Sequence, residues 1–114
     1  GDGTQTRGFT YIDDIARGTI LALKPMGYEI INLGGHEIMS VNELISKLED
    51  KIGRKAIINH YPMHKADMVA SQADVSKARK ILGWSPEINL DEGITRMIDW
   101  YNKEKIWVAK INTK

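Results

Sequence analysis

Residues 28–53, YEIINLGGHEIMSVNELISKLEDKIG, decide the fold class because a predicted strand is followed within a few residues by a predicted helix. The apolar run at 28–33 predicts the strand, and Gly34-Gly35 predicts its exit through a turn that needs positive φ. Ser40 and Glu43 have the spacing of a capping box, in which each side chain accepts from a backbone N–H of the other. Apolar residues then recur every three or four positions, which is typical of an amphipathic helix.

Further elements are predicted on both sides of this stretch. Three helices are expected: one from near Asp13 to before Pro25, one from Asp74 to Gly83, and one from Asn89 through Tyr101; a second strand is expected at 56–60. Alternating helices and short strands predict an α/β fold, a small mixed domain of about four helices and a few short strands. We expect this domain to cover residues 1–104 and to be followed by a tail at 105–114.

Length and composition narrow the function classes. A chain of 114 residues suffices for one domain. Its net charge of +1 gives no reason to expect a nucleic acid or an anionic membrane as partner. The absence of cysteine excludes disulfides, thiolate metal sites and cysteine nucleophiles, and it fits a reducing compartment. Because the sequence has no apolar run near 20 residues, we expect no membrane span.

Two polar segments are candidates for binding, and each has an ordinary structural alternative. Gly1-Asp2-Gly3 predicts a tight turn followed by Arg7, whose planar guanidinium suits a phosphate or carboxylate; the alternative is a surface arginine after a β-turn. Asp67 lies beside His64 and Lys65 in an aperiodic loop. Its carboxylate could accept a hydrogen bond from a sugar hydroxyl while His64 or Lys65 faces an anion; the alternative is a solvated loop with an ordinary charge pair. The three histidines lack metal-ligand spacing, so no metal site is predicted. Gly34-Gly35 lacks the spacing of a phosphate-binding loop.

Four segments, in order, resemble one family. Residues 1–16, GDGTQTRGFTYIDDIA, resemble the G-D-G-x-x-x-R-D-[FY]-x-[YH]-[VI]-x-D-[ILV]-A signature of extended short-chain dehydrogenases, which include UDP-glucose and UDP-glucuronate 4-epimerases. Residues 31–35, INLGG, are similar to their [YF]-N-[LIV]-G pattern. Residues 62–78 are similar to P-x-x-x-G-D-x-x-x-x-x-A-D-x-S-K-A, and residues 82–86, LGWSP, to L-G-[WY]-x-P.

The resemblance implies the carboxy-terminal, substrate-binding part of an NAD-dependent nucleotide-sugar epimerase or dehydratase. In this family an amino-terminal Rossmann domain binds NAD and holds the catalytic Tyr-x-x-x-Lys. We therefore expect no catalytic, cofactor-binding or metal-binding residue in this chain, and no catalysis by this part alone. The chain begins at Gly1 without an initiating Met, and we expect it to be cut from a longer sequence.

The resemblance also assigns the substrate-binding residues. Arg7 matches the arginine that binds the diphosphate of a UDP-sugar, and Asp67 matches the aspartate associated with the ribose and diphosphate. His64 stands where many sugar epimerases have a second phosphate-binding arginine. The chain departs from the pattern at Gly8, where an aspartate is usual, and at Ala66, where a glycine is usual.

The expected partners are a UDP-sugar and the protein's own Rossmann domain, in a cytoplasmic full-length homodimer. An alternative from another functional class is a free-standing helical module that binds or interacts without enzymatic activity. The coding sequence upstream of Gly1 distinguishes the two, because only the enzyme requires Tyr-x-x-x-Lys and a Gly-rich strand–turn–helix there.

Overall fold

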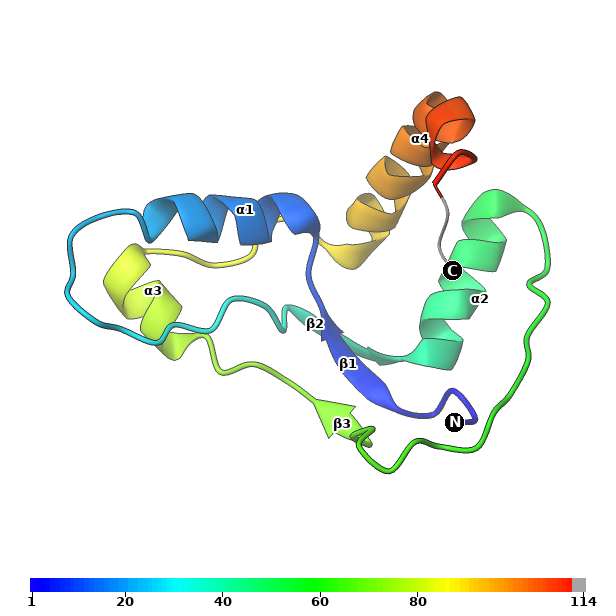
Figure 1. Cartoon of the computed structure of the whole chain (residues 1–114), viewed down its shortest axis with the longest axis horizontal. Helices are drawn as coiled ribbons and strands as arrows, with labels where there is room; N and C mark the ends of the chain where they lie inside the picture. The colour runs from blue at the N-terminus through cyan, green and yellow to red at the C-terminus, as the bar shows by residue number, and fades with distance from the viewer. Residues whose placement is uncertain (112–114) are drawn as a thin grey trace.

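The computed structural model describes residues 1–111 as four helices around a small sheet (Figure 1). The elements in chain order are β1 (Thr6–Phe9), α1 (Ile12–Leu21), β2 (Glu37–Ser40), α2 (Val41–Ile52), β3 (Ala70–Ser71), α3 (Ser76–Leu82) and α4 (Leu90–Val108). The predicted class, a small mixed α/β fold with about four helices, is confirmed. No helix within residues 1–111 is both long and apolar enough to cross a bilayer.

Strand β1 is the centre of the sheet, whose order is β2-β1-β3. It pairs antiparallel with β2, where Arg7 lies opposite Met39, and parallel with β3, where Arg7 lies opposite Ser71. The Thr6 N–H donates to the Val69 carbonyl at 2.9 Å, at the start of the parallel pair. The sheet therefore joins the beginning of the chain to two later segments.

The strands predicted at 28–33 and 56–60 do not form, so these predictions were wrong. Both segments lack a ladder partner in the described part of the chain, and Ile30 and Ile57 are 67% and 95% exposed. Residues with high β-propensity suit a paired, half-buried surface. A segment of such residues does not form a strand when no partner segment pairs with it. The strands that do form, β1, β2 and β3, are short and were not predicted.

The helix signals were more accurate. Ser40 and Glu43 form the predicted capping box at α2, and Gly53 ends this helix with φ 72°. Asn89 Oδ1 accepts from the Glu92 N–H at the start of α4. That helix runs through Val108, beyond the expected domain end at Glu104. Of the expected tail, 112–114 lie outside the described residues.

The other two helices begin differently from the prediction. Helix α1 begins at Ile12 after Tyr11, without a side-chain cap. Helix α3 begins at Ser76, two residues after the predicted cap Asp74, whose Oδ1 accepts from the Ser76 N–H at 2.9 Å. Asp74 therefore has a local structural contact just before the helix.

The buried core lies at one end of the molecule, where α3 packs on α1. Ala78, Leu82 and Trp84 form its centre. The indole N–H of Trp84 donates to the Asp14 carbonyl at 2.8 Å, which ties the segment after α3 to α1. In Figure 1, α2 and α4 lie at the opposite side of the sheet from this core.

Candidate functional site

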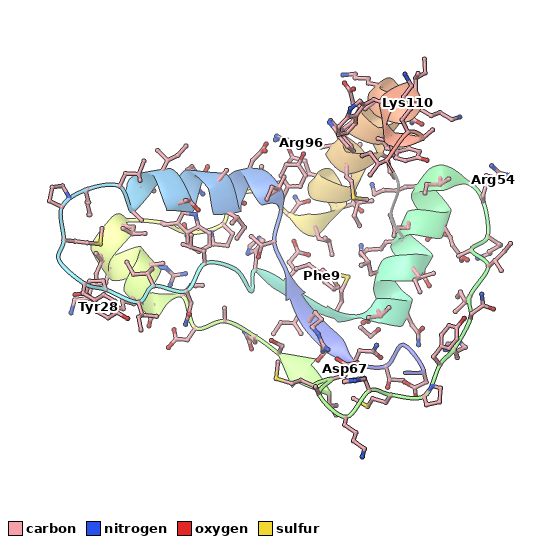
Figure 2. The ribbon with its side chains drawn as sticks, viewed as in Figure 1. Phe9, Tyr28, Arg54, Asp67, Arg96 and Lys110 are labelled. Carbon is pink, nitrogen blue, oxygen red and sulfur yellow. The ribbon has the colours of Figure 1, made fainter. Side chains whose placement is uncertain are left out.

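Arg7 projects from the central strand β1 and is held by two hydrogen bonds from its guanidinium. Nη1 donates to the Thr6 carbonyl at 2.8 Å, and Nη2 donates to Asp67 Oδ1 at 2.5 Å. Figure 2 shows Asp67 beside β1, just before β3. The structure thus brings together two predicted site residues that are 60 positions apart.

The pairing of β1 with β3 positions the loop that contains Asp67. Thr6 lies opposite Ala70 in the parallel register, so the residues just before Ala70 run past the start of β1. Within this loop the Asp67 N–H donates to the His64 carbonyl at 2.9 Å, which closes a turn over 64–67. His64, the third predicted site residue, is therefore in the same turn as Asp67.

The imidazole of His64 also takes part in this turn. Its Nδ1 accepts from the Ala66 N–H at 3.2 Å, and the side chain is exposed. An accepting Nδ1 requires that the proton of the neutral ring be on Nε2. In this form His64 offers one N–H donor at the ring edge away from the turn.

The Arg7–Asp67 pair is partly accessible, with side-chain exposures of 28% and 32%. A guanidinium has five N–H donors, so the two bonds described above leave donors for an anion. Arginine binds phosphate through parallel hydrogen bonds that a lysine cannot reproduce. The remaining guanidinium donors can therefore bind a phosphate or diphosphate group beside β1.

A hollow of about 370 Å³ is lined by residues that are close in sequence to Arg7, His64 and Asp67. Its lining comes from the start of the chain and the segments on either side of the 64–67 turn: Gly1, Asp2, Thr4, Gln5, His60, Tyr61, Met63 and Val69. Arg7, His64 and Asp67 do not line it. The three predicted residues lie at the surface, outside this hollow.

The two departures from the family pattern differ in their surroundings. A Cβ placed on Gly8 would lie 2.6 Å from the Cα of Gly35, so the two backbones touch. Ala66 lies within the turn and donates its N–H to His64. The close approach of Gly35 explains why a glycine is present at position 8, and Ala66 is compatible with the turn.

Gly34 and Gly35 have φ values of 140° and 70° and come just before strand β2. Dinucleotide-binding glycines instead follow a strand and open a helix, whose N-terminus faces the pyrophosphate. The described residues also contain no group of three or more His, Asp or Glu side chains that could hold a metal ion.

Asp14, a buried residue that connects α1 with the segment after α3, was not identified from the sequence. It is 1% exposed, and its Oδ2 accepts from the backbone N–H groups of Glu87 and Ile88, both at 2.9 Å. Its Oδ1 accepts from Arg17 at 2.7 Å. The family-like motif around Asp14 was the available signal, but no local pattern shows that its carboxylate reaches a segment more than 70 residues away.

Comparison with known proteins gives one consistent result. A family model described as GDP-mannose 4,6 dehydratase matches residues 1–97. A UDP-glucuronate 4-epimerase of Thermodesulfobacterium geofontis (strain OPF15) is 56% identical over 111 residues, which are 96% of this chain and 34% of the relative.

Two solved structures are similar in both sequence and fold. UDP-glucuronic acid 4-epimerase from Bacillus cereus, in complex with UDP-glucuronic acid and NAD, has a TM-score of 0.82 and 41% identity over 90% of this chain and 34% of its own. UDP-glucose 4-epimerase from Thermotoga maritima, with UDP-glucose, has a TM-score of 0.83 and 31% identity over 92% of this chain and 34% of its own. The chain spans about a third of the length of these relatives.

Proposed function

Because the chain belongs to the family described as GDP-mannose 4,6 dehydratase, we propose that it is the nucleotide-sugar-binding part of a longer NAD-dependent epimerase or dehydratase. In this role it binds the diphosphate of a UDP-sugar and performs no catalysis by itself. The resemblance to extended short-chain dehydrogenases is confirmed by the family match and by the similar epimerase structures. The UDP-sugar and the division of labour are our proposals.

The observation that supports this function best is the proximity of Arg7, Asp67 and His64. Arg7 and Asp67, selected by resemblance and 60 positions apart, form an ion pair beside β1, and His64 lies in the same turn as Asp67. A partly exposed guanidinium is present there with donors to spare. A surface arginine with no binding role would not require this arrangement.

The residues that the structure describes do not fit NAD. The Gly34-Gly35 pair leads into strand β2 and not into a helix N-terminus. The three-stranded sheet, with one antiparallel and one parallel pair, is not a doubly wound dinucleotide-binding sheet. We propose that NAD and the catalytic residues belong to the remaining part of the longer protein.

The large exposed area of the chain supports the proposal that another domain of the same protein packs against it. The chain exposes 8670 Å², about 2,400 Å² more than a compact monomer of this mass. Its radius of gyration is 16.6 Å, whereas about 13 Å is typical of a compact domain of this length. We propose that the Rossmann domain of the longer protein covers the excess surface. A homodimer and a cytoplasmic location remain predictions.

Substitution of Arg7 tests the proposed function in the complete protein. Arg7→Ala should weaken UDP binding about thirtyfold or more, because a lost charge-assisted pair costs about 2 kcal/mol or more. Arg7→Lys should restore only part of the affinity, since a point charge cannot make two parallel hydrogen bonds. Calorimetric titration with UDP and a UDP-sugar measures both effects.

Arg54→Ala is the matched control, because it removes the same charge from an exposed position. Figure 2 places Arg54 beyond the end of α2, away from Asp67. This variant should bind UDP like the wild type. If Arg7→Ala also binds UDP like the wild type, the proposed site is wrong, although the family match stands.

A further inference from the structure

One face of the second half of α4 alternates tryptophan and lysine. Trp100, Lys103 and Trp107 are three and four residues apart, so they share this face. The rings of Trp100 and Trp107 lie edge to face with their centroids 6.4 Å apart. Lys110 follows in the turn that continues the helix, where its N–H donates to the Trp107 carbonyl at 2.9 Å. We call these four residues the Trp–Lys stripe.

The stripe is exposed in both its apolar and its charged members. Trp100 and Trp107 are 50% and 55% exposed, and the side chains of Lys103 and Lys110 face solvent. The lysine ion pairs in the described part of the chain involve Lys47, Lys51, Lys55 and Lys77. Within residues 1–111 the two stripe lysines therefore keep their charge available for an anion from outside.

From this arrangement we infer that the Trp–Lys stripe associates reversibly with the surface of an anionic lipid bilayer. Tryptophan is enriched at membrane–water interfaces because its ring is apolar and its N–H is polar. A lysine beside it can lay its apolar stem along the interface while its ammonium reaches a lipid phosphate. This inference goes beyond the proposed function and does not depend on it.

The ring geometry favours a bilayer over a single-stranded nucleic acid. Aromatic residues interleaved with cations can also bind single strands, when successive bases stack on the ring faces. The planes of Trp100 and Trp107 are 82° apart and the rings touch edge to face, so they do not offer parallel faces to successive bases. A bilayer interface has no such requirement, and its lipid phosphates supply the negative charge that the lysines need.

The position of the stripe separates it from the nucleotide site. The family model matches residues 1–97, so the stripe lies beyond the matched part of the chain. Figure 2 shows Lys110 at the far end of α4, on the other side of the molecule from Asp67. The net charge of +1 gave no reason to expect a membrane partner, because the positive charge of the stripe is local and is balanced elsewhere in the chain.

Cosedimentation of the complete protein with lipid vesicles tests the inference. The protein should bind vesicles of phosphatidylcholine mixed with phosphatidylglycerol more tightly than vesicles of phosphatidylcholine alone, and added salt should weaken this binding by screening. Lys103→Gln/Lys110→Gln should weaken it about fivefold for each lysine removed. Trp107→Ala should weaken it about tenfold, because the ring no longer leaves water for the interface.

Lys55→Gln/Lys80→Gln is the matched control, since it removes the same charge from positions outside α4. This variant should bind the mixed vesicles like the wild type. A thermal melt of each variant establishes that it is folded. All variants should also bind UDP with wild-type affinity, because the stripe and the nucleotide site are separate.

Absence of binding to the mixed vesicles, equal binding to phosphatidylcholine alone, or equal losses in the two lysine double variants would each overturn the inference. Sedimentation without vesicles examines a second copy of the protein as the alternative occupant. If the stripe variants change the oligomeric state and the wild type does not bind vesicles, the stripe is a contact between copies and the inference is wrong. UDP binding is measured separately, so failure of the nucleotide site and failure of this inference are distinguishable.

Discussion

Asp14 connects α1 with the segment after α3 through its side chain. Its buried carboxylate bonds to Arg17 and to the backbone N–H groups of Glu87 and Ile88. Burial alone would raise the pKa of Asp14, but hydrogen bonds from Ile88, Arg17 and Glu87 outweigh this and hold the pKa below its ordinary value. The ionised form is therefore the one that stabilises the fold.

Asp14→Asn should weaken this connection by about 1–3 kcal/mol, because an amide has only one acceptor oxygen for a site that uses two. Either Arg17 or the two backbone N–H groups then face an NH₂ group. Amide hydrogen exchange at Glu87 and Ile88 measures the effect locally and should become faster. Asp13→Asn is the matched control, since Asp13 is 62% exposed and its contact with Arg96 is 3.5 Å long; equal effects at 13 and 14 would contradict the assignment.

The lowered pKa of Asp14 also predicts acid sensitivity of the same contact. A carboxyl group whose folded pKa is depressed contributes stability above its unfolded pKa, near 3.9 for aspartate. That contribution is lost as the pH falls from this value through the folded pKa. Protection of the Glu87 and Ile88 amides should therefore decrease below about pH 4 in the wild type. Asp14→Asn should show a flatter pH dependence, and a parallel decrease in the variant would exclude Asp14 as the cause.

At the scale of elements, the features predicted correctly are the helix caps, which depend on residues close together in the sequence. The caps of α2 and α4 were recognised because Ser40, Glu43 and Asn89 act within three residues of their partners. The strands were not recognised, because each depends on a partner segment distant in the chain. The run at 28–33 has better strand residues than β3, yet β3 forms where β1 is available.

The capping box at α2 gives a quantitative test at this scale. Ser40 ends β2 and caps α2, so its bonds with Glu43 hold a strand–helix junction that has no loop. Ser40→Ala should destabilise α2 by about 1 kcal/mol, as at other N-caps. Hydrogen exchange of the first-turn amides of α2 measures this loss, and Ser46→Ala in the middle of the helix serves as the control. If the two variants are equivalent, the junction does not depend on the cap.

At the scale of the whole molecule, the packing of the core is incomplete. Within residues 1–111 the buried apolar side chains are Ala78, Leu82, Trp84 and Ile94, whereas large apolar side chains are exposed on α1, on α4 and in the loops. Exposed apolar patches of more than a few hundred Å² usually mark interaction sites. This agrees with the proposed role as one part of a longer protein.

The 114-residue chain, prepared alone, should therefore self-associate as its concentration rises. Sedimentation equilibrium between micromolar and millimolar concentrations measures this association. Substitution of Ile106 and Trp107 by serine should weaken it, since these side chains are 80% and 55% exposed. A species that stays monomeric at millimolar concentration would contradict the expectation.

The candidate site depends on the whole fold, and sequence spacing could not predict it. Resemblance selected Arg7, His64 and Asp67, but nothing in their spacing indicated that the first and last would form an ion pair. That contact arises because β3 pairs parallel with β1.

The contact between Gly8 and Gly35 has an evolutionary consequence. A Cβ at Gly8 would meet the Cα of Gly35 at 2.6 Å, although aspartate is usual at this position in the family pattern. Substitution of Gly8 by aspartate alone would force apart two backbone segments, so its effect depends on the rest of the sequence. Such dependence is epistasis: a residue common in the family is unfavourable in this background. Ancestral or consensus substitutions at Gly8 should therefore be introduced together with changes around Gly35, never alone.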